Sequence, residues 1–148
     1  MFMEMAIVMA LLGDTQNPEA NREQHCLIEN AIFEAIGEGK KGMQLATEVA
    51  LNRVDSNYRG AGSFCKVVFD PHQFSWTSIP EEHRYPYTEE EYRQAAQVVL
   101  SVVYEEVDRI LPSHIRHYLN VEDATDLSWY DPSKVIYQHR NHQFLAVR

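Results

Sequence analysis

The sequence of 148 residues has few cysteines and few basic residues, and an abundance of either would point to a specialised class of protein. It contains two cysteines, too few for the disulfide framework of a small secreted scaffold. It holds 13 lysines and arginines against 22 acidic residues, a formal net charge of −9. Proteins that bind nucleic acid or anionic membrane surfaces normally present basic patches, so we expect neither partner here.

The sequence also lacks the run of about 20 apolar residues that crosses a bilayer. Residues 1–12 are apolar apart from Glu4, and no Lys or Arg precedes them, unlike a secretion signal. We interpret this stretch as a helix packed on the domain and ended by Gly13-Asp14. No stable membrane insertion is expected.

Metal-ligand spacing is absent as well, because no CxxC or CxxH pattern occurs. His114 and His117 lie three residues apart but follow Pro112, where a helix is not expected to continue. We expect no metal and no cofactor. Cys26 and Cys65 could pair, but the sequence alone favours two buried thiols.

The length and composition of the chain predict a single globular domain over residues 1–148. We expect residues 1–20 to form an N-terminal helical extension of it. The composition is 45% hydrophobic and 11% aromatic. A chain of this size buries about 70% of the surface that its unfolded form exposes, so it can build a core without metals or cross-links.

Capping signals and periodicity predict four further helices. Asn17-Pro18 begins the first, which ends near Gly37. The others cover residues 41–54, residues 63–69 with Ser63 as cap, and residues 88–111, where Thr88 and Glu91 form a capping box.

The last third has short β-prone runs at residues 117–120, 135–137 and 143–147, with a turn at Arg140-Asn141. We therefore predict an α+β fold, mainly helical, with a small antiparallel sheet.

Glu34 is the one polar side chain among residues 31–36, at the end of a helix. Apolar surroundings disfavour the charged carboxylate and raise its pKa. A carboxylic acid kept protonated near neutral pH can protonate the leaving oxygen of a glycosidic bond. The alternative is a glutamate that points to water or caps another helix.

Residues 69–77 combine aromatic, amide and hydroxyl side chains. Apolar sites with a few placed polar groups are typical of ligand binding, and sugars stack on aromatic rings. The alternative is that Phe74 and Trp76 belong to the core.

Several segments together resemble the cell wall hydrolase family typified by spore cortex-lytic enzymes. The matching segments are Glu34-Ala35-Ile36-Gly37-Glu38, Ala50-Leu51-Asn52-Arg53-Val54, Gln73-Phe74-Ser75-Trp76, His117-Tyr118-Leu119-Asn120 and Arg140-Asn141-His142-Gln143-Phe144. The resemblance covers residues 27–147. The family usually has glycine where this chain has Phe33 and Arg140, and arginine where it has Ile36.

The resemblance implies a fold like that of goose-type lysozyme and lytic transglycosylases. It implies cleavage of the β-1,4 bond between N-acetylmuramic acid and N-acetylglucosamine, with Glu34 as the catalytic acid. The residues expected to bind substrate are Glu38, Gln73, Phe74, Ser75, Trp76, Tyr118, Asn120 and His142. Glu38 could equally hold its loop, and His142 could equally be structural. Asn52 and Arg53 are expected to be structural, with Arg53 paired to an acid.

No second acid stands in a comparable setting, although most glycosidases use two. We therefore predict a lytic transglycosylase, in which the muramyl 6-hydroxyl is the nucleophile. Glu38, Glu48, Asp55 and Asp70 remain candidate second acids for a muramidase that uses water. A third alternative is a non-catalytic cell-wall-binding or virion protein that keeps the fold.

The expected partner is the glycan strand of peptidoglycan, bound by a monomer. The sequence has no clear signal peptide, which suits a phage endolysin or virion lysin made in the host cytoplasm and acting on the bacterial wall.

Overall fold

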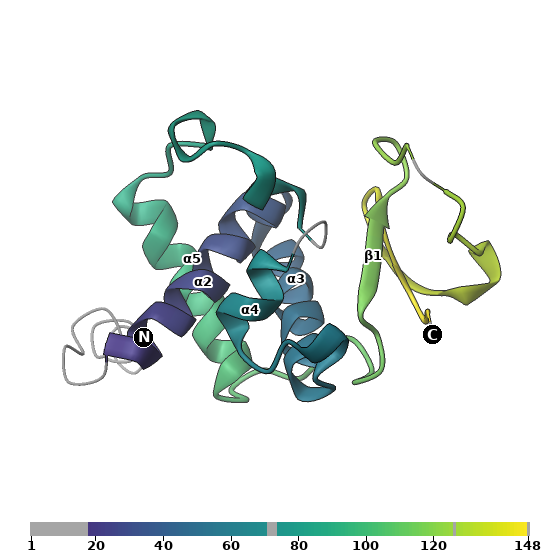
Figure 1. The fold of residues 1–148 in the computed structure, drawn as a ribbon, viewed down its shortest axis with the longest axis horizontal. Helices are drawn as coiled ribbons and strands as arrows, with labels where there is room; N and C mark the ends of the chain where they lie inside the picture. The colour runs from purple at the N-terminus through teal and green to yellow at the C-terminus, as the bar shows by residue number, and fades with distance from the viewer. Residues whose placement is uncertain (1–17, 71–73, 126, 148) are drawn as a thin grey trace.

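A computed structural model describes residues 18–70, 74–125 and 127–147 of the chain. The helix expected over residues 1–12 and the predicted site residue Gln73 lie outside the described residues. A helical body stands on one side and a three-stranded sheet on the other (Figure 1). The predicted mainly helical α+β class is confirmed.

Four helices form the body and three strands the sheet. The helices are α2 (Pro18–Ala35), α3 (Gly39–Asp55), α4 (Phe64–Phe69) and α5 (Glu89–Val103). The strands are β1 (His117–Asn120), β2 (Val135–His139) and β3 (His142–Leu145). Short 3-10 turns connect them: η1 (Ile36–Glu38), η2 (Tyr58–Gly60), η3 (Ser75–Ser78), η4 (Glu81–His83) and η5 (Pro132–Lys134).

The helix starts follow the local signals. In α4 the Ser63 side chain accepts a hydrogen bond from the Lys66 amide at 3.3 Å. In α5 the predicted capping box is present, because Thr88 Oγ1 accepts from the Glu91 amide and Glu91 Oε1 accepts from the Thr88 amide. Each bond satisfies a backbone donor that the first turn leaves open.

The predicted end of α5 is wrong. The helix ends at Val103 instead of reaching Leu111. Tyr104 caps it, and Glu105 has a left-handed φ of 57° that turns the chain away from the helix axis. Val107, expected on the buried face, is 41% exposed.

Glu48 gives the physical reason for the early end. Its side chain is fully buried, at 0% exposure, in the middle of α3. Its two oxygens accept hydrogen bonds from the amides of Ile110 and Leu111 at 2.8 to 3.1 Å, and from Gln44 Nε2 at 2.9 Å. A helix through residues 110–111 would use those amides internally. Glu48 therefore fixes an irregular segment, and its buried carboxylate is fully engaged in these hydrogen bonds.

Two further residues of α3 hold the segment that enters β1. Asn52 Nδ2 donates to the carbonyls of Pro112 and Ile115 at 3.0 and 2.9 Å. Arg53 Nε donates to the Arg116 carbonyl at 2.8 Å. These bonds support the structural role predicted for both residues, because they fix the approach of β1 to the helical body.

Arg53 lies over aromatic rings instead of forming the predicted acid pair. Its guanidinium carbon is 4.7 Å from the centre of the Phe74 ring and 5.6 Å from that of Tyr58. No ion pair of Arg53 is found among the described residues. A desolvated guanidinium is stabilised by such contacts.

The sheet has the order β1-β3-β2 and is antiparallel throughout. Tyr118 lies opposite Phe144, and Asn120 lies opposite His142. The predicted turn at residues 140–141 joins β2 to β3, and Arg140 adopts a left-handed φ of 52° there. This conformation costs an ordinary side chain about 1–2 kcal/mol. A hydrogen bond from Arg140 Nη1 to the Gly37 carbonyl, 2.9 Å long, offsets part of that cost.

Two buried clusters meet at Tyr118. The larger lies among the four helices, and the smaller joins α3 to the sheet through Leu45, Val49 and Phe144. Tyr118 packs against both clusters. The sheet is thereby docked on α3 by apolar burial as well as by hydrogen bonds.

Cys26 and Cys65 form a disulfide that links α2 to α4, with Cα atoms 5.3 Å apart. The prediction of two free thiols is therefore wrong, since pairing depends on a distance that the sequence does not state. The bond closes a loop with a sequence separation of 39 residues. In the chain-entropy treatment such a loop stabilises the folded state by about 4 kcal/mol.

Within the described residues, no helix is both long enough and apolar enough to cross a membrane.

The substitution Glu48→Gln tests the clamp on residues 110–111. The amide has one acceptor oxygen and turns an N–H donor toward backbone amides, so we expect the free energy of unfolding to fall by about 1–3 kcal/mol. Urea denaturation measures this. The matched control Glu82→Gln alters an exposed glutamate and should leave stability within about 0.5 kcal/mol. Equal stability of the two variants would contradict the assignment.

Candidate active site

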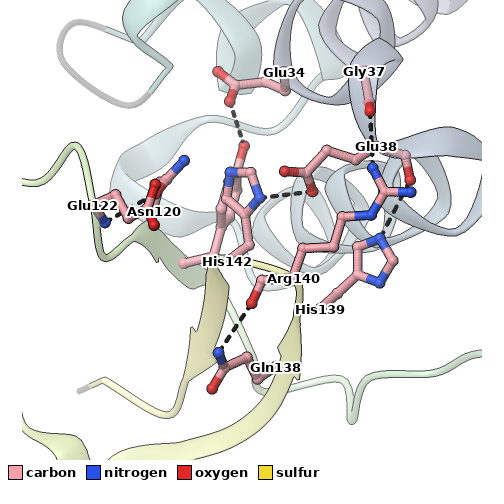
Figure 2. A network of polar contacts seen from close by, with 10 residues as sticks. Glu34, Gly37, Glu38, Asn120, Glu122, Gln138, His139, Arg140 and His142 are labelled. Carbon is pink, nitrogen blue, oxygen red and sulfur yellow. Dashed lines mark hydrogen bonds and ion pairs between the residues drawn. The ribbon is translucent and has the colours of Figure 1, made fainter.

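Glu34 in the last turn of α2 meets Tyr118 of β1. The Tyr118 hydroxyl donates a hydrogen bond to Glu34 Oε2 at 2.8 Å, across 84 residues of sequence. Figure 2 shows the Glu34 carboxyl directed from the helical body toward the sheet. Glu34 is partly buried, neither sealed in the core nor fully in solvent.

The surroundings of Glu34 favour its protonated form. Burial raises the pKa of Glu34, and this effect outweighs the hydrogen bond from Tyr118 and the charges of His142 and Arg53, which lower it. Burial and the nearby carboxylate also raise the pKa of Tyr118 well above its usual range. The Tyr118 hydroxyl therefore keeps its proton and acts as a donor. The apolar run of residues 31–36 led us to expect a raised pKa for Glu34, and these surroundings agree with that expectation.

Glu38 and His142 form a second polar pair in the same cluster. His142 Nδ1 lies 2.7 Å from Glu38 Oε2, and both side chains are largely buried (Figure 2). The backbone of η1 is held by the same hairpin, because His139 Nε2 contacts the Glu38 carbonyl at 3.3 Å and Arg140 donates to the Gly37 carbonyl. The hairpin thus holds the η1 turn, in part through the Glu38 carboxylate, and substrate binding by Glu38 stays a prediction.

Asn120 lies at the end of β1, opposite His142 in the register. Its side-chain oxygen accepts a hydrogen bond from the Glu122 amide at 3.0 Å, which closes the turn after the strand (Figure 2). The structure brings Glu34, Glu38, Tyr118, Asn120 and His142 together, as Figure 2 and the contacts above show. Sugar binding by these residues remains a prediction.

Phe74 and Trp76 are core residues, 1% and 3% exposed. Trp76 Nε1 donates to Asn30 Oδ1 at 2.8 Å, and its ring packs 4.7 Å from that of Phe33. A ring so enclosed offers no face for a sugar, which corrects the expected stacking role. Ser75, between them in sequence, is exposed on η3.

A model of the cell wall hydrolase family matches residues 37–145, most of the chain. The chain belongs to the cell wall hydrolase family. The predicted resemblance is confirmed, and membership indicates degradation of peptidoglycan. The match includes Glu38, Tyr118 and His142 and begins three residues after Glu34. Neither the curated proteins nor the solved structures yield a match, so the likeness to goose-type lysozyme stays a prediction.

In this cell wall hydrolase the other candidate second acids are occupied or exposed. Asp70 pairs with Arg59 Nε at 2.8 Å. Asp55 is the exposed last residue of α3. Glu38 is the candidate that lies in the cluster with Glu34, and its carboxylate is bound to His142.

The sequence analysis did not single out several residues that support the candidate site and the core beside it. Asn30 is fully buried and anchors Trp76, while His139 and Arg140 tie the hairpin to η1. The one sequence signal for Asn30 was its position, since it is a polar residue on the apolar face of a predicted helix. Among the described residues, no group of three or more His, Cys, Asp or Glu side chains could hold a metal ion.

The substitution Tyr118→Phe tests the donor to Glu34. Losing a hydrogen bond that stabilises the carboxylate should raise the pKa of Glu34 further above its ordinary value. Carbon-13 NMR titration of the glutamate side-chain carboxyls measures this directly. The control Tyr137→Phe changes another tyrosine of the sheet that packs on Phe144, and should leave the Glu34 titration in place. An unchanged or lowered pKa in Tyr118→Phe would refute the role of the hydroxyl.

Proposed function

We propose that this cell wall hydrolase is a glycosidase that cleaves the β-1,4 bond between N-acetylmuramic acid and N-acetylglucosamine, with Glu34 as general acid. The observation that carries the proposal is a partly buried carboxyl with a raised pKa, held by a neutral tyrosine donor. A general acid works best when its pKa lies near the working pH, because it must hold a proton and still release it.

In the first step the Glu34 carboxyl gives its proton to the glycosidic oxygen. The bond between that oxygen and the anomeric carbon breaks, and positive charge develops on the muramyl ring. Glu34 becomes a carboxylate. The Tyr118 hydroxyl, 2.8 Å from Oε2, and the nearby Arg53 and His142 charges stabilise it.

We further propose the transglycosylase route for the second step. The muramyl 6-hydroxyl attacks the anomeric carbon, and the Glu34 carboxylate accepts its proton, which restores the acid and leaves a 1,6-anhydro sugar. This route is supported by the contacts of the other carboxylates, because a carboxylate that is already engaged is less able to activate water. Glu38 is paired with His142, Asp70 is paired with Arg59, and Glu48 accepts backbone hydrogen bonds. A water-using muramidase is the alternative, with Glu38 as its base.

We also propose that the protein acts outside the cytoplasm, as a phage endolysin or virion lysin does. The disulfide between Cys26 and Cys65 supports it, because such bonds persist in oxidising surroundings. The net charge of −9 gives little attraction to an anionic wall. Short-range contacts are therefore expected to hold the glycan.

Replacement Glu34→Gln removes the titrating proton and keeps the shape of the side chain. We expect release of soluble fragments from purified sacculi to fall at least about 100-fold. Glu82→Gln is the matched control and should keep the wild-type rate. Circular dichroism melting confirms that both variants are folded. A Glu34→Gln variant with the wild-type rate would overturn the acid role.

Mass analysis of the released muropeptides distinguishes the two routes. The transglycosylase route yields anhydro-muramyl ends, each one water lighter than a hydrolysed end. We expect anhydro ends throughout the digest of the wild-type protein. Reducing muramyl ends alone would rule out the intramolecular attack and favour the muramidase alternative, while the role of Glu34 as acid would stand.

A further inference from the structure

A hollow with a volume of about 540 Å³ lies beside the sheet, and Glu34 is not among the described residues that line it. Its lining includes Trp129, Arg116, Lys134, Asp131 and His114. Trp129 is 40% exposed, whereas the other tryptophan of the chain, Trp76, is buried. The acid mechanism uses none of these lining residues.

Trp129 of the hollow contacts a residue of β1 whose side chain points to the opposite face from that of Tyr118. Trp129 packs against His117, with ring centres 6.0 Å apart. His117 precedes Tyr118 in β1, and successive side chains of a strand point to opposite faces. Tyr118 faces α2 and Glu34. Residues 127–134, which include Trp129, lie on the side of β1 away from the labelled helices (Figure 1).

Hydrogen bonds fix the segments that line the hollow. Tyr130, next to Trp129, donates its hydroxyl hydrogen bond to Gln143 of β3 at 2.6 Å. Asp131 caps η5 by accepting from the amide and hydroxyl of Ser133 at 2.9 and 2.7 Å. The Ala146 amide then donates to the Lys134 carbonyl at 3.1 Å. The indole is therefore presented at a fixed position, which lowers the entropy cost of binding.

The chemistry of the lining points to a sugar. An exposed indole face offers apolar contact to the axial C–H face of a pyranose, and the charged groups around it can bond to hydroxyl and acetamido groups. Arg116 and Lys134 together with Asp131 supply both donors and acceptors, which a neutral polyhydroxylated ligand requires.

We propose that the Trp129 hollow is an accessory sugar-binding site that holds a stretch of the β-1,4-linked N-acetylamino-sugar strand away from the bond that is cut. The proposal rests on the glycan substrate of the proposed function. A second contact on the same strand raises the effective concentration of substrate at the acid. This suits a chain whose overall charge gives it little attraction to the wall.

Tryptophan fluorescence tests the site without any turnover. The Glu34→Gln variant is titrated with the β-1,4-linked N-acetylglucosamine tetrasaccharide. We expect a saturable blue shift of emission, because the sugar shields the exposed Trp129 ring from water. The shift should vanish in Glu34→Gln with Trp129→Phe, where the buried Trp76 is the remaining fluorophore. No shift, or the same shift in both variants, would overturn the proposal.

Retention on intact sacculi gives the second readout. In the Glu34→Gln background, Trp129→Ala should weaken sacculus binding about fivefold, the loss expected for one aromatic contact. Tyr104→Ala is the matched control, since Tyr104 is 52% exposed and lies outside the hollow. Equal retention of the two variants, both folded by circular dichroism, would refute the site. The fragment release by wild type and Glu34→Gln tests the acid separately, so either proposal can fail alone.

Discussion

The hydrogen bond between Tyr118 and Glu34 is the contact on which the site depends. It joins a helix end to a strand that comes 84 residues later in sequence. The bond can form because Tyr118 packs on both buried clusters at once. If the sheet moved away from α3, Glu34 would gain water, and the burial that raises its pKa would be lost. The fold and the proposed acid chemistry therefore depend on the same interface.

Several polar contacts keep that interface closed, and each satisfies a group that burial would otherwise leave unpaired. Glu48 and Asn52 bind the segment that leads into β1, while Arg140 and His142 bind the η1 turn that follows Glu34. A buried carboxylate or amide without partners costs several kcal/mol. The same groups that pin the sheet would penalise any other arrangement, so they specify the geometry around the acid as well as stabilise it.

Two side chains at positions where the resemblance leads us to expect glycine tie distant segments together. Phe33 packs against Trp76 and Tyr87. Arg140 adopts a left-handed conformation, and its side chain donates a hydrogen bond to the Gly37 carbonyl. The candidate site is thus held in part by contacts that these two side chains make.

Short-range features of the fold are encoded in neighbouring residues. The helix starts at Pro18, Ser63 and Thr88 and the three strand runs follow from caps and residue types within a few positions. The sequence also pointed to Glu34 and to the family. Tertiary structure alone decided that α5 ends at Val103, that the two cysteines pair, and that Trp76 is core while Trp129 is exposed. Each of these outcomes depends on a partner far away in sequence, and a hydrogen bond, a disulfide or burial exists only once folding brings that partner within reach.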